Sequence, residues 1–223
     1  MAERGRPLPA LRLVGPEEPV SDEALVAALL DARARGERPD SGRAALEREF
    51  FDRYVPLVER TLRRILGREQ HDELSDLIHE AFVEALASLP QLSEAAALPG
   101  WMRSVAANVA YRTIRRRRAR RWLFFWEPAA IPEPPSIEAN PEVRAAFVAT
   151  YAALSRLGAE HRVCFALRHL EGLSLAEVAE ARGVSLATVK RRLATAEARF
   201  TRIAEGDPVL REWLTEGGRW TTR

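Results

Sequence analysis

Hydrophobic positions recur along this chain at the three- and four-residue spacing of amphipathic helices, and no stretch alternates for long enough to predict a strand. Four helices are predicted in the first half, separated by stretches that contain glycine, proline or serine. They cover about residues 21–35, 43–66, 72–89 and 100–121. Pro56 lies inside the second and predicts a kink or a break there. The first half is therefore predicted to be a helical domain.

A second group of helices follows a proline-rich stretch at residues 122–140, whose composition is typical of a linker. Asn140 is a helix cap with Pro141 at the first helical position, and Gly158 ends that helix. The predicted fold is all-α, with two small helical domains joined by a Pro-rich linker, the second ending in a helix-turn-helix. Its parts are a flexible N-terminal tail at 1–20, a domain at 21–121, the linker at 122–140, a domain at 141–203 and an extension at 204–223.

Residues 174–200 have the spacing of a helix-turn-helix. Ser174, with Glu177 three residues later, predicts a capping box, and Gly183 predicts the turn. Ser185 then caps a second helix with a regular apolar face. That face consists of Val189, Leu193, Ala196 and Phe200. The spacing predicts a buried stripe on one side of the second helix, which leaves the opposite side free for recognition.

The opposite side of that helix carries basic and hydroxyl side chains. The candidate DNA-binding residues are Ser185, Thr188, Lys190, Arg191, Arg192 and Thr195. Arginine can form a fork of hydrogen bonds to guanine, and threonine can contact a thymine methyl group or a phosphate, so this side suits a DNA major groove. The alternative is a solvated basic face on an ordinary helical hairpin. The agreement of cap, turn and face favours DNA binding.

Composition and charge change this picture in two ways. Hydrophobic residues make up 47% and charged residues 30% of the 223 positions, which is typical of a globular protein. The net charge of +2 conceals a basic run at 115–121 and an acidic segment at 72–84. A single cysteine excludes an intrachain disulfide. With no apolar run suited to a signal peptide or a membrane span, we expect a cytoplasmic protein that contacts no membrane.

The acidic segment predicts a helix with two opposed faces. Its acidic face consists of Glu73, Asp76, Glu80 and Glu84, and its apolar face of Ile78, Phe82, Ala85 and Leu89. Acidic stripes on helices are usually solvated. Beside two features that suit nucleic acid, the stripe is also what a basic protein partner would bind. The spacing alone leaves these two interpretations equal.

The helix at 100–121 carries a second stripe beside its apolar side. This stripe contains Ser104, Asn108, Tyr111, Arg112, Arg115 and Arg118. Arginines follow phosphates, while an aromatic ring or an amide can stack on or hydrogen-bond to an exposed base, so the stripe suits single-stranded or melting DNA. The helix dipole alone would also favour positive charge at this end. The arginine run exceeds what a dipole needs, which favours nucleic acid.

Enzyme chemistry finds little support. His161, Cys164 and His169 point in different directions around their helix and lack a fourth ligand for zinc. There is no glycine-rich phosphate loop, nucleophile elbow or HExxH pair. We therefore expect no enzyme activity, no metal and no cofactor, and we expect Cys164 to be a small core residue.

Three segments in order resemble the sigma-70 superfamily of bacterial sigma factors, in its small extracytoplasmic-function (ECF) group. They are DLIHEAFVEAL at 76–86, LPGWMRSVAANVAYRTIRRRRAR at 98–120, and the helix-turn-helix. The resemblance implies that the first domain binds the clamp helices of RNA polymerase and the melted −10 element. It implies that the second binds the polymerase flap and the −35 element. The residues that it implies in polymerase binding are Asp76, His79, Glu80, Phe82 and Leu86.

The implied function is that of a sigma factor, which binds core RNA polymerase and directs promoter recognition. The implied partners are core polymerase, promoter DNA and an anti-sigma protein, with a monomer when the chain is free. Three departures from the family pattern are His79, where the family often has glutamine, the aromatic cluster at 122–126, and the segment after Arg202, which extends beyond the family's usual end. Two other functions remain as alternatives. One is a helix-turn-helix transcription regulator that acts without joining polymerase, and the other is a helical protein-interaction adaptor that binds no DNA.

Overall fold

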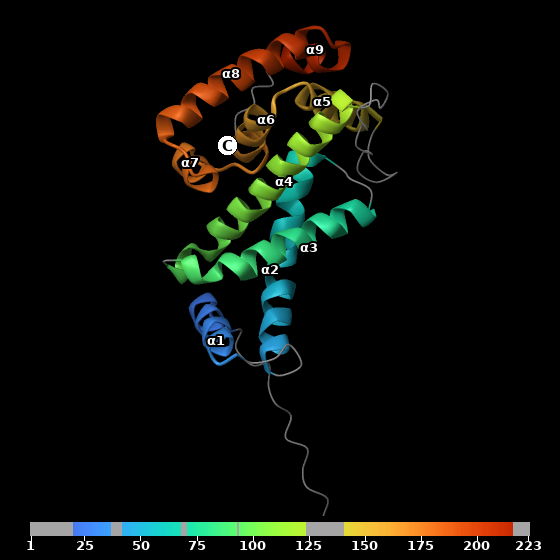
Figure 1. The fold of residues 1–223 in the computed structure, drawn as a ribbon. Helices are drawn as coiled ribbons and strands as arrows, with labels where there is room; N and C mark the ends of the chain where they lie inside the picture. The colour runs from blue at the N-terminus through green and yellow to red at the C-terminus, as the bar shows by residue number, and fades with distance from the viewer. Residues whose placement is uncertain (1–19, 37–41, 68–70, 93, 124–140, 216–223) are drawn as a thin grey trace, which may run out of the picture.

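The computed structural model describes residues 20–36, 42–67, 71–92, 94–123 and 141–215, and every regular element in these ranges is helical (Figure 1). The first domain contains α1 (Asp22–Ala34), α2 (Gly42–Leu66), α3 (His71–Ser88), the 3₁₀ turns η1 (Leu89–Gln91) and η2 (Ala95–Ala97), and α4 (Leu98–Leu123). The second contains α5 (Pro141–Ser155), α6 (Ala159–Phe165), the π-helical turn η3 (Ala166–Leu170), α7 (Leu175–Arg182), α8 (Leu186–Glu205) and α9 (Pro208–Thr215). The all-α prediction is confirmed. The predicted linker from 124 onward and the predicted tail up to 19 lie outside the described residues.

The core of the first domain forms where α2, α3 and α4 pack together. Phe50 and Leu62 of α2 and Met102 of α4 are fully buried, at the helical spacing that the sequence predicts. The ring of Phe50 meets that of Phe82 edge-on, with centroids 5.7 Å apart. Ser21 accepts a hydrogen bond from the amide of Ala24 and so begins α1 as predicted. These contacts place α3 and α4 side by side.

Pro56 does not break α2, so that part of the prediction is wrong. The helix continues from Gly42 to Leu66 with Pro56 inside it. A proline frees the carbonyl four residues earlier, here that of Asp52. Both residues are exposed, and water can hydrate the freed carbonyl. The cost of the missing hydrogen bond is therefore small enough for the helix to continue.

The extension that follows the helix-turn-helix forms a further helix, α9. Asp207 accepts hydrogen bonds from the amides of Val209 and Leu210, at 3.0 and 3.2 Å, and so caps α9. Leu210 is buried in one core with Phe200 of α8 and Ala153 of α5. This part of the extension packs against the second domain, while Trp220 lies outside the described residues.

The two domains pack directly against each other, which the linker at 122–140 does not predict. Helices α6 and α7 lie on α4, and η3 contacts α2 (Figure 1). One continuous core contains residues from both domains. On α4 the fully buried members Ala106, Ala107 and Ala110 are small, so another helix can approach closely. A linker pattern shows where the chain lacks helices, but it does not show whether two domains touch.

Hydrogen bonds join the domains at the end of α2. Arg162 of α6 donates from Nε to the carbonyl of Ile65 at 2.8 Å and from Nη2 to that of Leu66 at 2.9 Å. Tyr151 of α5 donates to the carbonyl of Arg63 at 3.3 Å. The last carbonyls of a helix lack partners within the helix and carry its negative dipole end. A cation and a hydroxyl from the second domain thus complete the C-terminus of α2.

Candidate nucleic-acid interface

The helix-turn-helix has the caps that its sequence predicts. The side chain of Ser174 accepts from the amide of Glu177 at 3.2 Å, and the carboxylate of Glu177 accepts from the amide of Ser174 at 2.7 Å. The hydrogen bonds from Ser174 lower the pKa of the Glu177 carboxylate below its ordinary value. Gly183 then turns the chain with φ +58°, and Ser185 caps α8. This geometry confirms α7 and α8 as a helix-turn-helix.

The exposed side of α8 is shifted from the predicted one. Lys190 and Arg191 are exposed as predicted. Arg192 is not presented in the same way: its side chain is 18% exposed and pairs with Glu160 at 2.8 Å. Thr195 donates back to the carbonyl of Arg191 at 3.0 Å. The side that faces solvent is therefore centred on Lys190 and Arg191 and not on the Arg192 side.

Apolar residues that sequence reasoning missed complete this exposed side. Leu186, at the start of α8, is 43% exposed, and Ala187 and Ala194 are also exposed. They surround Lys190 and Arg191 at helical spacing. Their spacing of three or four residues from Lys190 or Arg191 is the sequence signal that could have identified them. We call Leu186, Ala187, Lys190, Arg191 and Ala194 the exposed side of α8.

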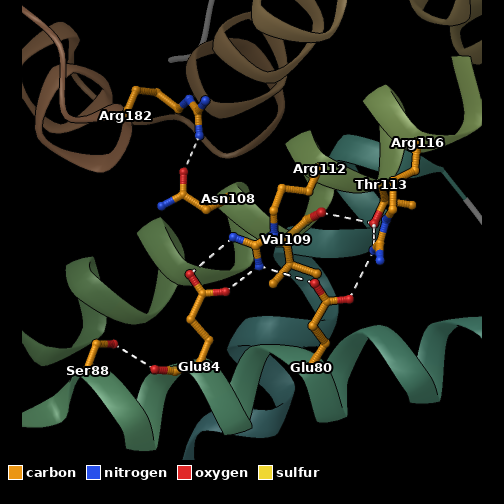
Figure 2. Close-up of polar contacts among 9 residues, drawn as sticks. All are labelled: Glu80, Glu84, Ser88, Asn108, Val109, Arg112, Thr113, Arg116 and Arg182. Atoms are coloured by element: carbon orange, nitrogen blue, oxygen red, sulfur yellow. Dashed lines mark hydrogen bonds and ion pairs between the residues drawn. The ribbon is translucent and has the colours of Figure 1, made fainter. Parts of the chain in front are cut away.

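The predicted exposed stripe of α4 is covered by the second domain, so its predicted exposure is wrong in this structure. Figure 2 shows Arg182 of α7 donating to Asn108, with Nη1 and Oδ1 2.5 Å apart. The Cζ atom of Arg182 lies 4.8 Å from the ring centroid of Tyr111. The hydroxyl of Tyr111 is 3.5 Å from Oε1 of Glu160. Packing of α6 and α7 on α4 covers a side that helical spacing alone presents to solvent.

The other members of the stripe lie outside this contact. Arg115 and Arg118 are exposed as predicted. The guanidinium of Arg115 also lies near the Tyr111 ring, with Cζ 5.8 Å from its centroid. Ser104 is half-buried and donates to the carbonyl of Gly100 at 3.0 Å. Exposed charge therefore remains at one end of the stripe while its centre is covered.

The acidic side of α3 turns toward α4 and pairs with its arginines. In Figure 2, Glu84 lies against Arg112, and Glu80 accepts from Arg112 at 3.2 Å and from Arg116 at 3.0 Å. Burial opposes ionisation of Glu80, but hydrogen bonds from Arg116 and Arg112 hold its pKa below the ordinary value. We call the pairs of Glu80 and Glu84 with Arg112 and Arg116 the α3–α4 ion pairs. The sequence left open whether the acidic face is solvated or binds a basic partner protein, and in this structure Glu80 instead meets arginines of α4.

The outer side of α3 carries only some of the residues expected to bind polymerase. Asp76 and His79 are exposed, while Leu86 is half-buried. Phe82 is 4% exposed and belongs to the core. Val83, which sequence reasoning missed, is 56% exposed and lies between His79 and Leu86. The spacing of 76, 79, 83 and 86 along one side of a helix is the signal that could have found it.

An apolar residue of α2 adjoins this outer side. Phe51 is 38% exposed, and its ring lies 4.6 Å from that of Phe82, centroid to centroid. Phe51 and Val83 are thus two exposed apolar side chains near Phe82, which contacts the first and precedes the second in the chain. An exposed apolar area rimmed by polar side chains is typical of a protein-binding surface.

Other chemistry gains no support from the geometry. Among the described residues no group of histidine, cysteine, aspartate and glutamate could hold a metal ion. Cys164 is buried as predicted, and burial raises the pKa of its thiol. None of the helices in the described ranges has the length and apolar character to span a membrane.

Two family descriptions match this chain. Sigma-70 region 2 matches residues 50–120, and Sigma-70, region 4 matches residues 141–200. The ECF RNA polymerase sigma factor SigM of Mycobacterium tuberculosis is 28% identical over 177 residues, which cover 76% of this chain and 86% of that protein. The ECF RNA polymerase sigma factor SigE of Mycolicibacterium smegmatis is 31% identical over 153 residues, 66% of this chain and 56% of that protein.

Two solved structures share the fold. The sigma factor RpoE in complex with the anti-sigma factor NepR, from Bartonella quintana, superposes with a TM-score of 0.54 and 18% identity over 71% of this chain and 98% of that one. CnrH in complex with the cytosolic domain of CnrY superposes with a TM-score of 0.53 and 18% identity over 83% of this chain and 98% of that one.

Proposed function

We propose a division of labour for this chain, which belongs to the sigma-70 family of RNA polymerase sigma factors, in its extracytoplasmic-function group. As a member of that family it is an initiation factor, not an enzyme, and it directs promoter recognition by RNA polymerase. The proposal concerns which of its surfaces performs each step. The steps are reading of the −35 duplex, capture of the melted −10 strand and binding of polymerase.

The exposed side of α8 reads the −35 element. The observation that carries this assignment is a capped helix-turn-helix whose second helix exposes Lys190 and Arg191. Arginine forms bidentate hydrogen bonds to guanine in the major groove, and recognition helices present their N-terminal residues there. Apolar Leu186 and Ala187 suit thymine methyl groups. Ser185, Thr188, Arg192 and Thr195 then contribute from the edges of this surface.

The stripe of α4 receives the melted −10 strand. Tyr111 offers a ring for base stacking, and Asn108 offers an amide for hydrogen bonds to a base edge. Arg115 and Arg118 are exposed and can follow phosphates. Stacking on protein side chains offsets part of the stacking that DNA loses when its strands separate. Ser104 and Arg112 belong to the same stripe as supporting positions.

The two DNA surfaces cannot bind their promoter elements at the same time while the domains are packed together. The −35 and −10 elements lie about 25 base pairs apart, which is roughly 85 Å at 3.4 Å per pair. In this structure α7 packs on α4, so the two surfaces adjoin. We therefore infer that the domains separate when the chain joins polymerase.

Polymerase binds the outer side of α3 and the adjoining apolar area. Asp76 and His79 supply polar contacts, and Val83, Leu86 and Phe51 supply apolar area for the clamp helices. Phe82 supports Phe51 from the core, and the second domain binds the flap. Since a sigma factor of the same fold is seen in complex with the anti-sigma factor NepR, we propose that this chain, a monomer when free, also meets an anti-sigma protein. A factor that works with polymerase at promoters acts in the bacterial cytoplasm.

Run-off transcription tests the proposal. The chain is mixed with core RNA polymerase and a genomic fragment library, and the transcripts are sequenced. Specific start sites are expected with the wild type and few with Arg191→Ala. Arg202→Ala is the matched control, because Arg202 is exposed on the same helix about 17 Å further along its axis. Specific DNA binding without transcription or polymerase pull-down would instead support a regulator that acts alone.

A further inference from the structure

We propose that Tyr111 and Asn108 form a binding site for one unpaired nucleobase, and that Arg182 occupies this site in the closed arrangement in place of the base. Helix α7 of the second domain then competes with the melted strand for α4. This inference rests on the proposed function of the α4 stripe and adds the residue that blocks it. It predicts that removal of the positive charge of Arg182 strengthens binding of the chain to single-stranded DNA.

The geometry of Arg182 is that of a flat group held like a base. Its Cζ atom lies 4.8 Å from the ring centroid of Tyr111, and its Nη1 donates to Oδ1 of Asn108 at 2.5 Å (Figure 2). A nucleobase with an exocyclic amino group offers the same two features, a planar π face and an in-plane N–H donor. The guanidinium shares both features, since it is planar, stacks on aromatic faces and carries its N–H donors in its plane.

The contact of Arg182 with α4 is one that a nucleobase can displace at little energetic cost. The hydrogen bond of the Arg182 side chain goes to the neutral amide of Asn108 and not to a carboxylate, and among the described residues its buried Nε has no hydrogen-bond partner. Desolvation lowers the pKa of the Arg182 guanidinium below its ordinary value, because burial penalises the charged form. An arginine held only by an amide and an aromatic ring loses little interaction free energy when a base and its phosphates take its place.

The competition follows from the position of Arg182 in the chain. It is the last residue of α7, directly before the turn at Gly183. Any movement that lifts the helix-turn-helix off α4 withdraws the guanidinium from Tyr111. The site for the base therefore becomes free in the same movement that separates the two domains.

Fluorescence anisotropy with a labelled single-stranded oligo-deoxyadenylate tests the proposal on the full chain. Arg182→Ala is expected to bind the oligonucleotide about tenfold more tightly than the wild type, although it loses a positive charge. Arg202→Ala, which removes an exposed positive charge of the same domain, is expected to bind equally or slightly more weakly. Equal or weaker binding by Arg182→Ala would overturn the proposal.

A second comparison assigns the gain to the base site. In a Tyr111→Ala background the change at Arg182 is expected to give no gain, and an abasic oligonucleotide is expected to show none with either protein. A gain that survives both changes would mean that Arg182 restrains the domains without occupying a base site. That result would also overturn the proposal.

Nitration by tetranitromethane supplies a readout that does not depend on DNA. The chain has three tyrosines, and Tyr54 and Tyr151 are 5% and 7% exposed. Nitration of Tyr111, located by mass spectrometry, is expected to rise several-fold in both Arg182→Ala and Arg182→Gln, while circular dichroism stays unchanged. Unchanged nitration of Tyr111 in folded variants would contradict its occlusion by Arg182.

Failure of this inference is distinguishable from failure of the proposed function. If wild-type protein supports specific run-off transcription and Arg182→Ala shows no gain on the oligonucleotide, only the role of Arg182 is wrong. If the wild type supports no transcription and neither Arg182→Ala nor Arg182→Gln binds the single strand, the assignment of α4 fails and the site with it.

Discussion

Two arginines of the second domain are directed at the first domain, and they are held in different ways. Arg162 is 9% exposed and donates to two carbonyls at the end of α2. Arg182 rests on a tyrosine ring and one amide and leaves its Nε without a hydrogen bond among the described residues. The first contact satisfies groups that no other partner in the helix can satisfy. The second covers groups that a nucleic acid can satisfy as well.

The two contacts differ in how much free energy is needed to break them when the domains separate. A buried guanidinium paired with helix-end carbonyls is costly to remove, because both sides are left without partners. A guanidinium on a ring has a ready substitute in a base. We therefore expect the end of α2 to set the energy of domain separation, and the α4 stripe to respond to DNA.

The largest effect is expected when the Arg162 contact is removed. Arg162→Ala leaves the carbonyls of Ile65 and Leu66 buried without donors, and it should lower the free energy of unfolding by about 3 kcal/mol. Urea denaturation followed by circular dichroism measures this loss. Arg156→Ala, which changes an exposed arginine directly after α5, is the control and should change stability by less than about 0.5 kcal/mol. Equal effects of the two variants would remove the distinction drawn for Arg162.

The next largest effect is expected at Arg191, which is exposed on α8 in the closed arrangement. Arg191→Ala should weaken binding to the −35 duplex by about 1–3 kcal/mol and relax the preference at one base pair. Competition binding with single-base variants of the duplex measures both changes. If the loss is the same for every sequence, Arg191 contacts phosphate and not a base.

A smaller effect is expected from pH at the end of α2. Burial raises the pKa of Tyr151 to about 12, from an ordinary value of 10.0. The folded state therefore holds this proton more tightly than the unfolded state. The resulting stability is complete below pH 10 and falls as pH rises toward 12, by up to about 1.4 kcal/mol per pH unit. Unfolding measured from pH 9 to 11 should show this slope.

Tyr151→Phe is the matched variant for that measurement. It removes the titrating hydroxyl and should flatten the slope between pH 10 and 11, at a uniform cost of about 1 kcal/mol for the lost hydrogen bond. Burial and hydrogen bonding to Asp22 also raise the pKa of Tyr54, so part of the slope remains in the variant. A slope identical to that of the wild type would exclude Tyr151 as its source.

The smallest effect tests the α3–α4 ion pairs. Glu80→Gln with Glu84→Gln removes the carboxylates that pair with Arg112 and Arg116, and non-specific DNA binding should strengthen a few-fold. The salt slope of binding should steepen by about one unit for each arginine that gains a phosphate contact. Asp76→Asn is the control, since Asp76 is exposed on the same helix and, among the described residues, forms no ion pair with Arg112 or Arg116. Equal slopes in all three proteins would mean that the pairs do not limit DNA binding.

Local features of the fold follow from the sequence because their causes lie within a few residues. The caps Ser21, Ser174 and Ser185 and the turn at Gly183 depend on neighbouring backbone groups, and all four are confirmed. The buried side of α8 follows equally from its period. The side of α8 that faces solvent was harder to predict, because Arg192 pairs with Glu160 from another helix.

The sequence by itself determined most of the helices, the caps of three of them and the buried side of α8, although it predicted neither the continuity of α2 at Pro56 nor α9. Through its motifs it also indicated the family. Only the tertiary structure decided what the polar sides of α3 and α4 meet: Glu80 pairs with Arg112, and Arg182 covers Tyr111. The physical reason is the distance along the chain over which each kind of interaction acts. Capping and helical period act over one or two turns, whereas Arg182 and Asn108 are 74 residues apart and meet only because α7 packs on α4.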